Sequence, residues 1–151
     1  MANLVFNYFK QAVLQGSLNL QSAAANKIMV ALVNNSAAAG LNIDTHKYFG
    51  MINGTYEISG AAQIAYTAGG KILSSPNVQQ DDTGNQGVLF GTAILWASST
   101  ITAAGAVLYA SSGNGYASDP LICFVDFTAN QTSSNGNFQI NWAATGILAL
   151  T

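Results

Sequence analysis

The sequence predicts a mainly β fold, an antiparallel β-sandwich with one N-terminal α-helix, in a single domain of residues 1–151. About eight short strand-like segments are separated by turns rich in Gly, Asn and Ser, which is typical of a sandwich or a barrel. Between Asn137 and Trp142, apolar and amide residues alternate with the period of a strand that has one dry and one wet face. A chain of this length buries about 68–70% of its unfolded surface, so its core needs no disulfide or metal.

The first element that we expect is a helix from Asn3 to Gly16. Asn3 is a favourable N-cap residue, and Gly16 can end the helix. We expect its apolar face to pack across the sandwich or to close one end of it, with packing on a neighbouring subunit as the alternative. This face carries residues at helical spacing, namely Val5, Phe9, Ala12 and Val13.

The segment from Lys27 to Val33 is almost entirely apolar, which predicts a strand of the buried kind. Residues 37–40 are expected to form a loop, and Asp44 is expected to cap a helical turn of residues 45–49. A short strand over residues 56–59 is expected after an Asn-Gly turn.

Two adjacent glycines, Gly69 and Gly70, indicate a tight turn, a bulge or a close approach of another segment. A strand is expected to begin at residues 78–80, and the polar residues 81–87 are expected to form a loop. Strand character resumes over residues 88–96 and again over residues 101–109, with a bend at the glycine inside the second segment.

The last third of the chain is expected to end in a hairpin. Residues 111–120 form a loop rich in Gly, Ser and Asn, and residues 121–127 form a strand that leads to the hairpin. Asn135-Gly136 is a strong tight-turn signal before the alternating strand. Residues 147–150 then read as a short final strand.

The charge content is low, since charged residues make up 7% of the chain and soluble domains average about 25%. There is no arginine and the net charge is −2, so we expect no nucleic-acid partner. The apolar runs are of strand length and the N-terminus lacks the pattern of a signal peptide, so we expect no membrane segment. A neutral polar surface fits either an ordinary β-domain or a subunit packed in a larger assembly. The positive charges are Lys10, Lys27, Lys47 and Lys71.

The Asp81-Asp82 pair with Asn85 offers oxygen atoms that can bind calcium. Its spacing does not match the twelve-residue calcium loop, and the glutamate that ends such a loop is missing. The pattern fits an Asx-rich turn better.

Nucleophilic and phosphate-binding motifs are weak. His46 is the only histidine and cannot make a zinc site by itself. Cys123 lies in an apolar run and is expected to be a small buried side chain, where a thiolate is disfavoured, so a Cys123–His46 nucleophile pair is not expected. Residues 68–71 lack the glycine spacing of a phosphate loop.

No acid and base pair with a reason for shifted pKa values is found among the six carboxylates, and Asp126 is expected to point outward. Phe138 and Trp142 can stack on a sugar or a base, but their place on the dry face favours core packing. We therefore expect no catalytic residue, no cofactor, no metal and no enzyme activity. The carboxylates are scattered at Asp44, Glu57, Asp81, Asp82, Asp119 and Asp126.

Several stretches, in the same order along nearly the whole chain, resemble small virion structural proteins of tailed bacteriophages. The departures are alanine-rich, charge-poor loops at residues 37–39 and 61–62. The matching stretches are residues 6–7 with the following helix, 27–32, 56–60, 66–71, 80–83, 94–96, 106–109, 119–122, 125–127, 137–142 and 146–150.

The resemblance implies a capsid cement, or decoration, protein with a jelly-roll sandwich. Its partners would be the major capsid protein and other copies of itself, as a dimer or trimer, on the exterior of a virion whose proteins are made in the host cytoplasm. A tail or head–tail joining subunit is one alternative, and a carbohydrate-binding sandwich that uses its aromatics and the Asp81-Asp82 loop is another. The resemblance assigns no site residue, and the neutral loops of residues 111–118 and 129–134 are candidate contact segments.

Overall fold

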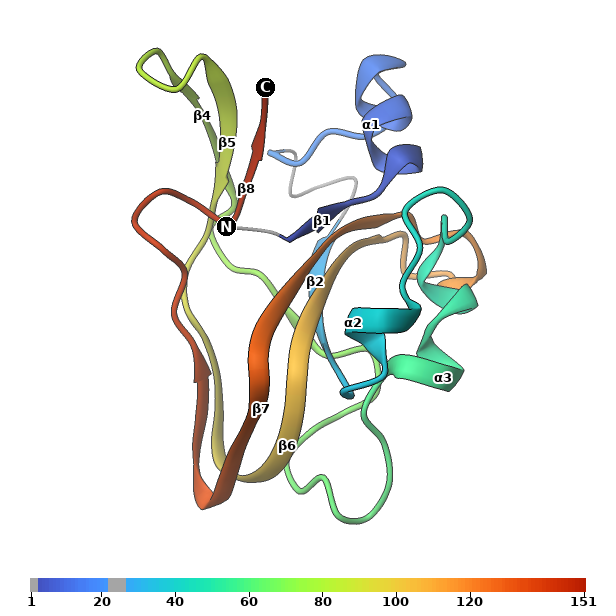
Figure 1. The fold of residues 1–151 in the computed structure, drawn as a ribbon, viewed down its shortest axis with the longest axis vertical. Helices are drawn as coiled ribbons and strands as arrows, with labels where there is room; N and C mark the ends of the chain where they lie inside the picture. Colours follow the sequence, from blue (N-terminus) through green and yellow to red (C-terminus); the bar gives the residue numbers. More distant parts are fainter. Residues whose placement is uncertain (1–2, 22–26) are drawn as a thin grey trace.

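The computed structural model describes residues 3–21 and 27–151, and it confirms a mainly β, antiparallel fold (Figure 1). The longest helix of the described residues is α1 (Asn7–Leu14), and α2 (Ala37–Gly40) and α3 (Asn53–Tyr56) are single turns. Two 3-10 turns are η1 (Phe49–Met51) and η2 (Tyr116–Ser118). The strands are β1 (Leu4–Val5), β2 (Lys27–Val33), β3 (Lys71–Ile72), β4 (Asn77–Asp81), β5 (Gln86–Phe90), β6 (Ile94–Ser111), β7 (Leu121–Ile140) and β8 (Leu148–Leu150).

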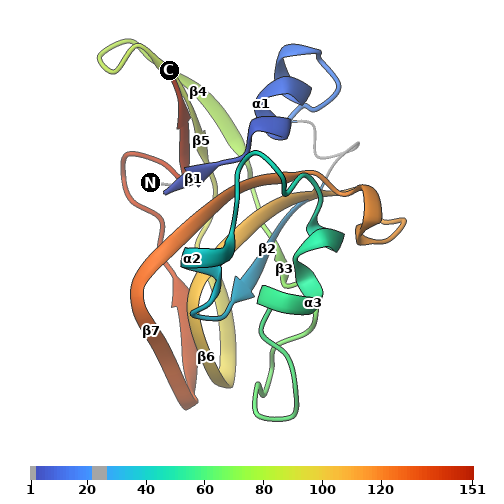
Figure 2. The same cartoon turned by 45° about the vertical axis from the view of Figure 1, so that its right-hand side comes forward.

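The strands form two antiparallel sheets in a sandwich-like arrangement. The larger sheet has the order β1-β7-β6-β2-β3, and the smaller has the order β4-β5-β8. Strands β6 and β7 form one long ribbon that bends sharply at the lower end of Figure 1 and rises again toward the smaller sheet. Figure 2 shows α1 near β1 at one end of the molecule, and α2 and α3 beside the larger sheet.

The core is built largely from β2, β6 and β7 and from the short helices and turns that pack on them. Trp96, Tyr109 and Phe49 are almost fully buried, and the rings of Phe49 and Tyr109 stack with centroids 4.0 Å apart. The alternation predicted for residues 137–142 is confirmed as far as Ile140, because Phe138 and Ile140 are 5% and 7% exposed and Asn137 and Gln139 face solvent. Strand β7 ends at Ile140, and Trp142 beyond it is half-buried. Burial of such large apolar side chains is the main favourable term in folding.

The predicted N-terminal helix begins later than expected. Residues Leu4–Val5 form β1 and pair with β7, so the prediction was wrong for the first turn. Asn3 does not cap the helix, since its Oδ1 accepts a hydrogen bond from the N–H of Asp126 at 2.6 Å. The end was predicted correctly: Gly16 has φ +70°, and its N–H and that of Ser17 donate to the last carbonyls of the helix.

Three predictions in the next segment were wrong. Residues 37–40 form the single turn α2 instead of a loop, and the expected strand at residues 56–59 is replaced by α3 and one bridge between Glu57 and Val33. Residues 45–49 form no helical turn, because the side chain of Asn42, not Asp44, accepts the N–H groups of the local turn.

Strands β2 and β4 confirm the predictions for residues 27–33 and 78–80. The expected strand over residues 88–96 is divided between two strands, because strand structure is interrupted between the end of β5 at Phe90 and the start of β6 at Ile94. The bend inside residues 101–109 is confirmed as a register shift next to Gly105, where a Cβ atom would lie 2.5 Å from the Phe124 ring.

The predicted C-terminal hairpin is absent from the described residues. Asn135-Gly136 lies inside β7, which runs from Leu121 to Ile140 and pairs with β6 on both sides of Asn135-Gly136, with breaks in the register. Residues 129–134 are therefore strand and not loop. The final strand is confirmed as β8, but it pairs with β5 of the smaller sheet.

Candidate functional site

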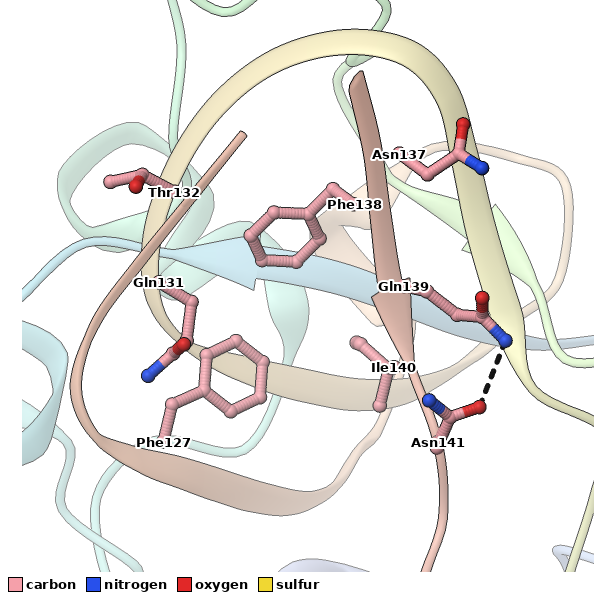
Figure 3. Close-up of a pocket in the computed structure, with 8 residues that line it drawn as sticks. All are labelled: Phe127, Gln131, Thr132, Asn137, Phe138, Gln139, Ile140 and Asn141. Carbon is pink, nitrogen blue, oxygen red and sulfur yellow. Dashed lines mark hydrogen bonds between the residues drawn. The ribbon is translucent and has the colours of Figure 1, made fainter. Parts of the chain in front are cut away.

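The most distinctive surface feature is a cleft at the open edge of β7, between the two arms of that strand (Figure 3). We call residues 121–132 of β7 arm one, residues 137–140 of β7 together with the following Asn141 arm two, and the space between them the edge cleft. Figure 3 shows Phe138 and Ile140 on the side that faces arm one, with Gln139 and Asn141 on the opposite side. The edge cleft has a volume of about 400 Å³ and is lined by Phe127, Gln131, Thr132, Asn137, Phe138, Gln139, Ile140 and Asn141.

The bend between the arms is built by matching irregularities in the two strands. Ser98 of β6 and Asn135 of β7 both have positive φ, +49° each, and the register of the two strands shifts at this point. The hydroxyl of the fully buried Ser99 lies 2.8 Å from that of Ser133 and donates to the carbonyl of Gly136 at 3.0 Å. These bonds satisfy polar groups inside the bend and fix the angle between the arms.

The outer edge of arm two has no partner strand in the described structure. Strand β1 pairs with β7 only at Phe124 and Cys123, and beyond Phe124 only β6 pairs with β7. Along arm one the edge is interrupted, because residues 127–130 bulge opposite the single residue Ala104 of β6. Arm two is therefore a regular edge whose outward N–H and C=O groups are free for another strand.

A second depression is an apolar groove between α1, the segment after it, and the smaller sheet. It has a volume of about 500 Å³, and its side chains are mostly apolar. Val78 of β4 lies on it and is 40% exposed, and Leu14 at the end of α1 is 88% exposed. We call this surface the apolar groove, and its apolar lining includes Phe9, Val13, Leu20, Val78, Val88 and Leu150.

The only buried carboxylates of the described chain, Glu57 and Asp119, act as acceptors that hold loops. Glu57 Oε1 accepts hydrogen bonds from the Tyr66 hydroxyl and from the N–H of Gly69, and Tyr66 in turn accepts the N–H of Leu32. Asp119 Oδ1 accepts the N–H and hydroxyl of Ser112, and its Oδ2 has no partner in the described part of the chain. Among the described residues, no group of three or more His, Cys, Asp and Glu side chains is placed to hold a metal ion.

Burial raises the pKa of Glu57, and the hydrogen bonds from Tyr66 and Gly69 partly oppose that shift. The folded state therefore binds the Glu57 proton more tightly than the unfolded chain does. The unfolding free energy consequently falls as pH rises above the ordinary carboxyl pKa of 4.5.

The substitution Glu57→Gln keeps an oxygen that can accept the hydrogen bonds from Tyr66 and Gly69 and removes the carboxyl group that titrates. We expect it to raise the unfolding free energy at pH 7 and to flatten its fall above pH 4.5, measured by urea titration across pH. An unchanged slope in the variant would show that another group carries the dependence.

The Asp81–Asn85 segment is the Asx turn that the sequence favoured over a calcium site. Asp81 Oδ1 accepts the N–H groups of Thr83 and Gly84, and its Oδ2 accepts the amide of Gln86. These bonds, first of all the one from Gln86, lower the pKa of Asp81. Its oxygen atoms are occupied by the hairpin itself.

The other candidate residues are not brought together. Cys123 is fully buried in β7, and burial raises its thiol pKa to about 12, which disfavours the thiolate. The Nδ1 atom of His46 accepts a hydrogen bond from the N–H of Asn42, and the imidazole ring packs against the ring of Tyr56. Two of the three expectations for Gly69-Gly70 are confirmed: the N–H of Gly70 donates to the carbonyl of Thr67 in a tight turn, and the segment closely approaches β2. The Nζ atom of Lys71 lies over the Trp96 ring, 5.6 Å from its centroid.

The aromatic side chains confirm the core interpretation over sugar stacking. Phe138 is nearly buried and packs edge-on against Trp96. Trp142 is half-buried, and its indole N–H donates to the carbonyl of Thr92 at 2.9 Å. Sequence reasoning missed the edge cleft, for which only the uncharged composition of residues 127–151 was a signal.

Comparison with protein-family models, with curated proteins and with solved structures gave no match. No helix within the described ranges is long and apolar enough to span a membrane.

Proposed function

We propose that this chain is a non-enzymatic virion protein, a cement protein that binds the outer face of a bacteriophage capsid shell. The proposal rests on the resemblance of the sequence to small phage virion proteins, including the jelly-roll type, and on the character of the surface. The apolar groove is the main structural support, because apolar side chains of α1 and of all three strands of the smaller sheet line it, and none of its described lining residues is charged. A groove of this kind fits an apolar ridge on a protein partner.

The mechanism would be repeated burial on the assembled shell. A standard interface removes about 1,600 Å² from water, and a protein that binds the assembled shell but not its free subunits stabilises the assembly by mass action. A surface with few charges loses little free energy of hydration on contact. The partner in this mechanism would be the major capsid protein.

The first test is the copy number of the chain in purified virus particles, measured by quantitative mass analysis against the major capsid protein. We expect a copy number close to that of the capsid protein. A copy number of a few per particle would replace the cement role by the tail or head–tail joining role, and absence from the particles would overturn both.

The groove itself is tested by Val78→Glu, which places a charge on its rim. We expect binding to shells that lack the chain to weaken by roughly tenfold or more in co-sedimentation, because an unpaired charge is costly to bury. The matched control is Gln79→Glu, which adds the same charge to the opposite face of the same strand. Equal loss in both variants, or loss in neither, would contradict binding through the apolar groove.

A further inference from the structure

We propose that the outer edge of arm two is a self-association site, at which a second copy of this chain pairs antiparallel with the first about a two-fold axis through Gln139. The edge cleft supports this, because it touches every residue from Asn137 to Asn141 in succession. Side chains alternate between faces along a strand, so a cavity on one face would touch every second residue. A cavity that follows consecutive residues lies along the backbone edge, where another strand adds.

The sequence of arm two is complementary to itself in this register. With Gln139 on the axis, Phe138 lies opposite Ile140 of the second copy, and Asn137 lies opposite Asn141 of the second copy. Apolar residues therefore meet apolar residues on the inner face, and amides meet amides on the outer face. Such matched cross-strand pairs stabilise a sheet, and a two-fold interface requires a surface that matches itself.

The charge distribution favours the same partner. A two-fold axis brings identical side chains together, so a charge on the axis would repel its own copy. No charged residue occurs from Phe127 to Thr151, and arm two contains no lysine or proline of the kind that protects exposed edges from pairing. A second copy of the chain can therefore pair along the whole edge without charge repulsion.

The other free edges of the described sheets are less suited to pairing. Strands β1 and β8 have two and three residues, and β3 has two, one of them Lys71. Strand β4 ends in Asp81 and is followed by Asp82. On β4, Val78 would face Gln80 of a second copy, so an apolar side chain would meet an amide. Strand β6 has a further free edge over residues 94–104, beyond its pairing with β2, but Thr100 bridges Ile64 there and Lys71 Nζ donates to the carbonyl of Leu95. Arm two is the described edge of four or more residues that carries neither a charge nor such a contact.

Pairing at this edge would also complete the core. The added strand would place its Phe138 and Ile140 on the side that faces arm one, over the partly exposed Phe127. Phe127 already packs near Phe138, with ring centroids 6.3 Å apart. The open edge of the sandwich is therefore closed by the second copy, without any contribution from a capsid shell.

The inference is tested by charge substitution on the axis. We expect the purified chain to show a concentration-dependent dimer in sedimentation analysis. Gln139→Lys and Gln139→Glu should each give monomers, because like charges meet on the axis, and an equimolar mixture of the two variants should restore the dimer. The control is Gln11→Lys on the exposed face of α1, which should leave the dimer unchanged. Thermal melting checks that the variants fold, as expected for an exposed position.

The register is tested by Gln139→Cys, which places two thiols opposite each other across the axis, within reach of a disulfide. We expect a covalent dimer on mild oxidation, and none from Gln11→Cys. The buried Cys123 does not compete. A wild-type chain that stays monomeric at all concentrations, or a dimer that survives Gln139→Lys, would overturn the proposal. Both measurements use the chain without capsid shells, so this result is independent of the cement role.

Discussion

Gly70→Ala is expected to lower the unfolding free energy by more than about 4 kcal/mol, enough to leave much of the protein unfolded at 37 °C. Gly70 has φ +76°, and a Cβ atom there would lie closer than 3.0 Å to the carbonyl of Val30 in β2. The clash is with backbone, so it cannot be relieved by a side-chain rotation. The measurement is equilibrium unfolding in urea, with the soluble yield of the variant as a second readout.

Gly113→Ala is the matched control for this prediction. Gly113 also has positive φ, +79°, but nothing lies within 4 Å of the added Cβ atom. Its cost is therefore the backbone strain alone, about 1–2 kcal/mol. The difference between the two variants measures the close approach of the Gly69-Gly70 segment to β2. Equal costs would mean that this segment does not pack against β2 as described.

Trp96→Ala is expected to destabilise the protein by about 3–5 kcal/mol, the range for removal of a buried aromatic side chain. Trp96 is 1% exposed, lies between the arms of the ribbon and contacts the rings of Tyr66 and Phe138 at centroid distances of 6.1 and 6.0 Å. Its removal leaves a cavity where arm two meets the core. Thermal melting and urea unfolding both report the loss.

Leu95→Ala provides the comparison one residue earlier on the same strand. Leu95 is 40% exposed on the other face, so we expect a change of about 0.5–1 kcal/mol. If Leu95→Ala were the more damaging of the two, the inward and outward faces of β6 would be reversed, and with them those of arm two.

Elements with a strong local pattern could be predicted from the sequence. Strand β2 is a continuous apolar run after Lys27. In the Asx turn after β4, the Asp81 side chain accepts hydrogen bonds from backbone N–H groups two and three residues further on. The alternation of arm two specified which side chains are buried, because a period of two has a physical cause within each strand. Gly16 marked the end of α1, since glycine adopts positive φ at little cost.

The bend of the ribbon could not be predicted, because its cause is shared between two strands far apart in the sequence. Asn135-Gly136 favours positive φ, which serves either a hairpin turn or a bulge. The partner strand decides between them: Ser98 and Ser99 bend β6 at the same level, and the Ser99 hydroxyl binds across to that of Ser133. Serine residues in a strand carry no signal of this kind when they are read alone.

The N-terminal strand and the edge cleft were missed for a related reason. Leu4–Val5 is apolar and fits the face of a helix, and only the presence of β7 beside it favours a strand. The edge cleft is open because no strand of the described structure pairs with the outer edge of arm two. No pattern within one strand records which neighbours it lacks, so the uncharged composition was the sole indication.

The long ribbon of β6 and β7 also gives the folding reaction a direction. Its first pairs, next to the connection that contains η2, join residues close together in the chain, and each further pair toward Ile94 and Ile140 closes a slightly longer loop. Pairing of β6 with β7 can therefore proceed one residue pair after another, from that connection to the bend and beyond it. Arm two pairs with β6 last, and until it does, both of its uncharged edges are open to any neighbouring nascent chain.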